Sequence, residues 1–79
     1  MMKVQVEFVG AINSGPFKKK QPFELNDKAT VKDLLEKLTH IDKGHLSFIQ
    51  VVRNGSRVAQ NQSLKDGDKI ELMLMVGGG

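Results

Sequence analysis

The chain contains few residues with the side-chain chemistry that catalysis or metal binding requires. It has no cysteine, which excludes thiol catalysis, disulfides and thiolate metal sites. Its two histidines, His40 and His45, flank Asp42 at a spacing that is not a familiar metal-ligand pattern. Asp66 and Asp68 surround a glycine, which is typical of a turn in which aspartate accepts backbone hydrogen bonds. Because no nucleophile, base and orienting acid can be assembled, we expect no enzyme activity and no bound cofactor or metal.

The final residues offer a different chemistry, that of the backbone itself. The sequence ends in "ELMLMVGGG", so the reactive group is the carboxylate of Gly79. A carboxylate that must enter the narrow site of another enzyme needs a thin, flexible segment before it. Glycine provides such a segment because it lacks Cβ. Ordering such a segment costs about 1–2 kcal/mol per residue, so the folded body must supply the docking energy. We therefore predict a domain over residues 1–76 and a flexible tail over 77–79. The alternative is a frayed terminus or a cloning remnant.

Length and composition limit the remaining possibilities. Seventy-nine residues form one domain, and 39% hydrophobic with 27% charged residues is ordinary for a globular protein. No apolar run approaches the roughly 18 residues of a membrane span, and no signal-peptide pattern opens the chain, so we expect a cytoplasmic location. The net charge of +3 is weak for a nucleic-acid binder, and we predict no nucleic-acid partner. The lysine run 18–20 is typical of a solvated loop, with docking of an acidic partner as the alternative.

The first part of the chain predicts two strands. Residues 3–9 and 21–26 alternate apolar and polar side chains, as half-buried strands do. Turn-forming residues between them indicate a long hairpin loop. Pro22 has no N–H to donate, so the second strand belongs at a sheet edge.

A helix is predicted next, over residues 29–40. Four apolar residues occur at the i, i+3, i+4, i+7 spacing of a single buried stripe: Val31, Leu34, Leu35 and Leu38. Thr30 and Asp33 have the spacing of a capping box, which would begin the helix. A loop over residues 41–46 follows.

The rest of the chain predicts three more strands. Residues 47–59 indicate a hairpin with Asn54 and Gly55 at its turn, since this pair supplies positive φ angles. After a second turn, the last strand alternates two sets of residues. We expect one set to pack under the helix (Ile70, Leu72, Leu74 and Val76) and the other to face away from it (Glu71, Met73 and Met75).

The predicted order is therefore strand, strand, helix, strand, strand, strand. One helix with one apolar stripe is accommodated most simply on one face of a single mixed sheet. The sequence thus predicts an α+β protein with the β-grasp arrangement, in which a mixed five-stranded sheet has one helix packed on one face.

The last part of the chain, "VVRNGSRVAQNQSLKDGDKIELMLMVGGG", resembles the ubiquitin-like sulfur carriers of thiamin and molybdopterin biosynthesis. The resemblance depends on "NG" after a strand, on "LKDGDKIEL" at residues 64–72 and on the terminal "VGGG". Gly78 and Gly79 match the diglycine of this family.

The resemblance implies a reaction cycle in which the chain is a carrier and does no catalysis. A ubiquitin-activating-like adenylyltransferase would use ATP to adenylate Gly79, and sulfur would then replace the activated oxygen to give a thiocarboxylate. A sulfur-accepting synthase would be the second partner. The thiamin branch fits better, because residues 73–76 lack the aromatic residue and proline pair of the molybdopterin carriers.

Two other functions remain open at this point. The chain could be a ubiquitin-like modifier, in which Gly79 is joined to lysines of target proteins. It could also be a β-grasp interaction module that never uses its terminus.

A partner surface is predicted on the sheet face opposite the helix. Phe48, Val52, Met73 and Met75 would form an exposed apolar patch there, leading to Gly77 and the tail. Exposed apolar patches mark interfaces, and methionine adapts to irregular surfaces. The alternative is that a loop or a dimer partner covers this face.

Overall fold

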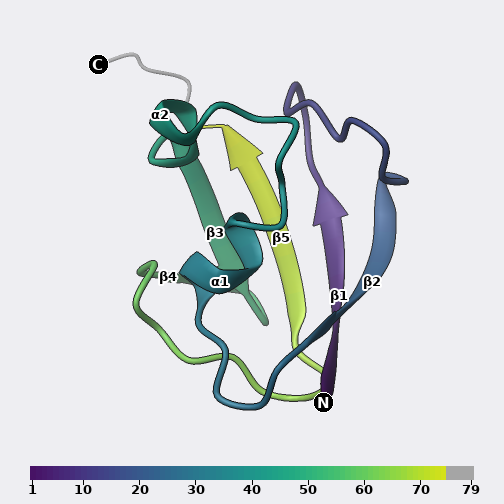
Figure 1. The fold of residues 1–79 in the computed structure, drawn as a ribbon, viewed down its shortest axis with the longest axis vertical. Coiled ribbons are helices and arrows are strands. Elements are labelled where there is room, and N and C mark those ends of the chain that lie inside the picture. The colour runs from purple at the N-terminus through teal and green to yellow at the C-terminus, as the bar shows by residue number, and fades with distance from the viewer. Residues whose placement is uncertain (75–79) are drawn as a thin grey trace.

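A computed structural model describes residues 1–74, in which one five-stranded sheet carries two short helices on one face (Figure 1). The elements in chain order are β1 (Met2–Phe8), β2 (Lys20–Leu25), α1 (Val31–Leu35), α2 (Lys43–Leu46), β3 (Ile49–Arg53), β4 (Ser56–Val58) and β5 (Lys69–Leu74). The predicted tail 77–79 lies outside the described residues. Within residues 1–74, no helix is both long enough and apolar enough to cross a membrane.

The strand order is β2-β1-β5-β3-β4, which confirms the β-grasp prediction. β1 and β5 pair in parallel at the centre, and the other pairs are antiparallel. β2 is an edge strand, as the missing N–H of Pro22 predicted. In this topology β5 lies between two neighbours, and its carboxyl end points to the end of the molecule that carries α2 (Figure 1).

The core fills the space between the sheet and the helices. The predicted helical stripe is confirmed, since Val31, Leu34, Leu35 and Leu38 are all at most 1% exposed. They pack against the inward residues of the central strands, including Val4, Val6, Ile70 and Leu72. Leu64, in the "LKDGDKIEL" stretch, belongs to the same cluster.

The helix is shorter than the predicted range of residues 29–40, since α1 covers only Val31–Leu35. Its start is confirmed, because Thr30 N donates to Asp33 Oδ2 at 2.8 Å and Asp33 N donates to Thr30 Oγ1 at 3.4 Å. The regular helix ends at Leu35. Leu38 N then donates to Leu35 O at 3.0 Å, a tighter i→i−3 bond that still carries Leu38 into the core. In the segment expected to be a loop, residues 43–46 form the single turn of α2.

A polar network centred on Asp68 closes the end of the sheet near the amino terminus. Asp68 is only 5% exposed, and its Oδ2 lies 3.3 Å from Arg53 Nε. Asn54 Nδ2 donates to its Oδ1 at 3.0 Å, and Lys65 N donates to Oδ2 at 2.8 Å. Asn54 adopts the positive φ expected of the hairpin turn, 50°. The aspartates of this stretch therefore build turns, as predicted, and Asp66 also accepts a 2.7 Å bond from Lys3 N in β1.

The loop between β1 and β2 folds back on the core through its aromatic residue. Phe17 lies with its ring centroid 4.9 Å from Phe23 and 5.9 Å from the His40 ring. His40 Nε2 donates to the carbonyl oxygen of Asn13 at 2.7 Å. Gly15 adopts a φ of +55°, and a Cβ there would come within 2.5 Å of the His40 ring. His40 thus anchors the loop, whereas the lysines at 18–20 stay exposed.

Candidate functional site

The candidate site is the end of the molecule where β5 finishes. Leu74 is the last described residue, and only five residues separate it from the predicted reactive carboxylate of Gly79. Whatever acts on that carboxylate must approach this end. The predicted site residues Met75, Gly77, Gly78 and Gly79 lie outside the described residues.

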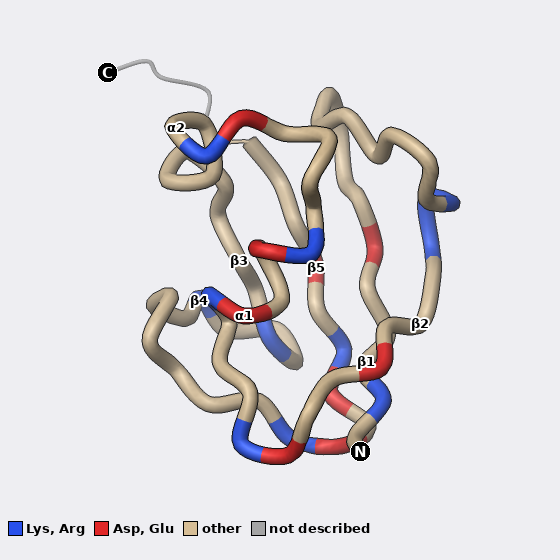
Figure 2. Tube along the Cα trace, viewed as in Figure 1, with Lys and Arg blue, Asp and Glu red and all other residues tan. Residues whose placement is uncertain are grey.

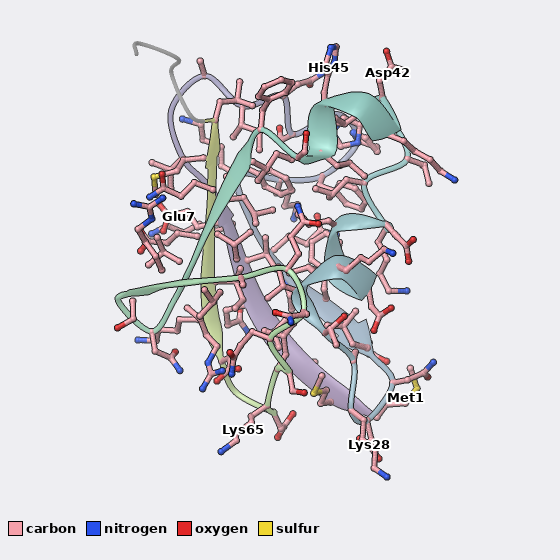
Figure 3. The ribbon with its side chains drawn as sticks, turned by 90° about the vertical axis from the view of Figure 1, so that its left-hand side faces the viewer. Met1, Glu7, Lys28, Asp42, His45 and Lys65 are labelled. Atoms are coloured by element: carbon pink, nitrogen blue, oxygen red, sulfur yellow. The ribbon has the colours of Figure 1, made fainter. Side chains whose placement is uncertain are left out.

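A groove of about 500 Å³ opens at this end, and we call it the Phe48–Leu74 groove. Its lining comes from three segments: Ala11, Ile12 and Asn13 of the first loop, His40, Ile41, Asp42 and His45 before and within α2, and Phe48 with Leu74. Phe48 is 54% exposed and Leu74 is 39% exposed. Among residues 1–74, Met1 is the one other large hydrophobic side chain that is exposed, and it lies at the opposite end (Figure 3).

Charged residues are sparse around this groove. Residues 8–17 contain none, and Asp42 with Lys43 are the charged residues of the segment 38–48. Figure 2 shows the contrast with the end near the amino terminus, where residues of both signs crowd the turns. In the side view, the labelled Asp42 and His45 project outward from the α2 end (Figure 3). The groove therefore combines apolar side chains with polar ones, and of its lining residues only Asp42 carries a full charge.

The prediction that Leu74 packs under the helix is wrong, although it holds for Ile70 and Leu72, which are 1% and 0% exposed. The reason is length. A five-residue helix is about 7–8 Å long, whereas a six-residue strand spans roughly 20 Å. α1 therefore covers only part of β5, and Leu74 lies beyond it at the edge of the groove.

Phe48 also lies elsewhere than predicted. Alternation along β3 placed it beside Val52 and Met73, but β3 begins at Ile49 and Phe48 belongs to the turn that follows α2. Its backbone N–H donates to the carbonyl of His45 at 3.0 Å, and the two rings are 6.4 Å apart. This turn directs Phe48 into the groove with Leu74. The structure thus divides the predicted patch between two places.

Val52 and Met73 remain on the face opposite the helices, as predicted, but both are partly buried. They lie on adjacent strands, where Val52 pairs with Glu71 and Met73 pairs with Gln50. The surrounding face is charged: Glu7 lies opposite Lys20 on one side and Glu71 on the other. Figure 3 shows Glu7 pointing away from the helices. This face carries charges of both signs on adjacent strands, whereas Asp42 is the one charged residue that lines the groove.

The sequence analysis did not predict the groove, although one feature of the sequence pointed to it. The uncharged run of residues 8–17 contains Ala11 and Ile12, which line it. What periodicity could not supply was the ending of α1 before it covers Leu74. Within the described residues, no cluster of three histidine, aspartate or glutamate side chains could hold a metal ion.

The fold and the position of β5 define a ubiquitin-like protein, and comparison with family models identifies which kind. The model of the ThiS family matches residues 6–79. The chain therefore belongs to the ThiS family, whose members are ubiquitin-like sulfur carriers and not enzymes.

Several solved structures share this fold. In the Helicobacter pylori complex of subunits 1 and 2 of molybdopterin-converting factor, the matching chain is 28% identical, with a TM-score of 0.68 over 99% of this chain and 100% of that one. Small archaeal modifier protein 1 of H. volcanii is 22% identical, with a TM-score of 0.78 over 96% and 100%. A Caldiarchaeum subterraneum ubiquitin is 22% identical, with a TM-score of 0.65 over 99% and 98%. A comparison with curated proteins found no match.

Proposed function

We propose that this chain carries sulfur as a thiocarboxylate on Gly79 and delivers it to cofactor biosynthesis, with a thiamin-type pathway favoured over a molybdopterin-type one. The observation that carries the proposal is the family match, which extends through Gly78 and Gly79. The branch preference is supported by the family model and by residues 73–76, which lack the aromatic residue and proline pair of molybdopterin carriers.

The chemistry requires little from the chain itself. The Gly79 carboxylate attacks the α-phosphate of ATP, and pyrophosphate leaves to give an acyl adenylate. A sulfur nucleophile at the oxidation level of sulfide then attacks the carbonyl carbon, AMP leaves, and a thiocarboxylate remains. The partner enzyme binds the ATP and stabilises the leaving groups. The chain supplies the carboxylate, the glycine segment and a folded body that docks.

Two partners follow from this cycle, an adenylyltransferase resembling ubiquitin-activating enzymes and a synthase that accepts the sulfur. The H. pylori relative was solved with subunit 2 of its converting factor, which supports a partner enzyme of the second kind. Neither partner requires a metal or cofactor bound to this chain.

The alternative function is protein modification. It is favoured by the likeness of the fold to a small archaeal modifier protein, which covers 96% of this chain. Both functions use the same activated carboxylate, and they differ in the group that receives it. Sulfide would give the carrier, and a lysine amine of a target protein would give a conjugate.

Intact-protein mass spectrometry of the natively expressed chain distinguishes these functions. We expect a species heavier by the exchange of one oxygen for one sulfur, absent from a variant that lacks Gly79. A control variant, Lys28→Gln, alters an exposed residue at the opposite end and should keep the species. Isopeptide-linked conjugates in the lysate would instead establish the modifier. An unmodified terminus without conjugates would contradict both and leave an interaction module.

A further inference from the structure

We propose that Asn54 is a site of spontaneous deamidation, and that two hydrogen bonds of its side-chain amide, to residues 68 and 69, slow this reaction in the folded chain. The proposal concerns the hairpin turn between β3 and β4, so it is independent of the proposed function of the carboxyl terminus. The group that reacts is the asparagine amide, and the one co-reactant is water.

The sequence selects Asn54 among the asparagines of the chain. It is the one asparagine that a glycine follows, whereas the other three precede Ser14, Asp27 and Gln62. Gly55 has no Cβ, so its backbone nitrogen is the least hindered of the four. Asn54 and Gly55 are both exposed, and apart from the chain neighbours nothing lies within 4 Å of the place that a Cβ on Gly55 would take. Water can therefore reach this turn.

Asparagine is a thermolabile residue, and its amide is lost in two steps. The backbone nitrogen of Gly55 gives its proton to hydroxide and attacks Cγ of Asn54. A C–N bond forms, and the Nδ2 group takes a proton from water and leaves as ammonia, so that a five-membered succinimide remains. Water then opens this ring at either carbonyl to give aspartate or isoaspartate at position 54. No atom is oxidised or reduced in either step.

The fold holds the Asn54 amide at both of its polar atoms. Nδ2 donates to Asp68 Oδ1 at 3.0 Å, and Oδ1 accepts from Lys69 N at 2.9 Å. The backbone N–H of Asn54 also donates to Lys69 O at 2.8 Å. Ring closure expels Nδ2 and makes Cγ tetrahedral, so the first bond breaks and the second must change direction. The reaction therefore loses interactions that exist only in the folded chain.

The anchor of the amide and the backbone of the turn are both fixed. Asp68 is 5% exposed, accepts from Lys65 N at 2.8 Å and lies 3.3 Å from Arg53 Nε. Asn54 has a φ of 50°, and its flanking residues Arg53 and Ser56 pair across the hairpin. The succinimide ring includes the backbone that joins residues 54 and 55, so it imposes its own ψ angle on this turn. Ring formation thus competes with the pairing of β3 and β4.

Deamidation would damage the network that slows it. An aspartate at position 54 has a carboxylate oxygen in place of the Nδ2 donor, which lies 3.0 Å from Asp68 Oδ1. Two carboxylates would then face each other beside one cation, Arg53, and like charges at this separation repel. Isoaspartate adds a methylene group to the backbone of a tight turn, which disturbs the pairing of Arg53 with Ser56. Either product should weaken the hairpin.

The first experiment follows residue 54 by peptide mapping and mass spectrometry while the purified full chain is held at neutral pH. Asp68→Ala removes one hydrogen bond and the anchor, so we expect it to raise the rate of deamidation at Asn54 about tenfold. Gly15→Ala is the control, because it destabilises the first loop and leaves Asp68 in place. Its rate should stay much closer to that of the unaltered chain.

Two results of this experiment would overturn the proposal. Equal rates for Asp68→Ala and Gly15→Ala would show that loss of stability alone exposes Asn54, and that the hydrogen bonds do not restrain it. The unaltered chain should deamidate faster in urea than in buffer, because unfolding removes the restraint. An intact Asn54 after prolonged incubation in urea would show that it is not a site of deamidation.

The second experiment tests the damage to the hairpin. Asn54→Asp reproduces one product of the reaction, and Asn61→Asp adds the same charge at an exposed asparagine outside the network. Urea denaturation should show a lower midpoint for Asn54→Asp, whereas Asn61→Asp should stay close to the unaltered chain. Equal midpoints for the two variants would contradict the predicted repulsion between positions 54 and 68.

Discussion

The two ends of the molecule differ in how their side chains are paired. Near the amino terminus, Asp68 forms an ion pair with Arg53 and accepts hydrogen bonds from Asn54 and from the backbone of Lys65. The polar groups of three segments are thus paired with one another. At the other end, Phe48 and Leu74 leave apolar area exposed around a groove. At the first end the polar groups have partners within the chain. At the second end the exposed apolar side chains could be covered by a partner. This difference predicts that changes at the Asp68 network affect stability more than changes at the groove do.

Removal of the Asp68 carboxylate should have the largest effect on stability. Asp68→Ala leaves the largely buried Arg53 without its counterion and two N–H donors without an acceptor, so we expect the free energy of unfolding to fall by about 3 kcal/mol. Urea denaturation measures the change. Asp66→Ala, which removes one exposed hydrogen bond to Lys3 N, should cost only about 1 kcal/mol. Equal losses for the two variants would contradict the central role of Asp68.

The loop that borders the groove provides an intermediate test. Gly15→Ala places a Cβ against the His40 ring and keeps a positive φ, and should lower the free energy of unfolding by about 2–3 kcal/mol. Gly10→Ala is the matched control, because its φ is +74° but nothing lies within 4 Å of the added Cβ. It should cost about 1 kcal/mol. If thermal unfolding gives the same loss for both, the contact with His40 is not what fixes the loop.

The smallest effect on stability is expected at the groove itself. Phe48 is more than half exposed, so Phe48→Ser should lower the free energy of unfolding by less than about 1 kcal/mol. The same urea titration used for Asp68→Ala provides the comparison. A loss as large as that of Asp68→Ala would show that the groove residues hold the fold, and the predicted difference between the two ends would then be wrong.

Local signals in the sequence predicted most of the fold. Period-two alternation located the strands, Pro22 identified the edge, and the spacing of Thr30 and Asp33 marked the start of the helix. Asn54 and Gly55 predicted the hairpin turn through their tolerance of positive φ. Each of these signals depends on the chemistry of a few neighbouring residues, which is why the sequence alone contained it.

The groove could not be predicted from local sequence patterns, because it depends on where separate elements lie in space. Leu74 shares the alternation of Leu72, and its exposure follows from how far α1 extends over the sheet. Phe48 fits the alternation of β3, but the turn after α2 redirects it. In both cases the arrangement of separate elements in space decides the outcome. The prediction for the tail, residues 77–79, stays a prediction.

The place of β5 in the sheet also has a mechanical consequence. The strand is hydrogen-bonded to β1 on one side and to β3 on the other. A pull applied beyond Leu74, along the strand, would load both ladders in shear, so that many hydrogen bonds resist together. An edge strand under the same pull would have only one ladder to resist it. This resistance suits the proposed carrier cycle, in which one enzyme and then the next would draw on the end of the chain while the domain stays folded.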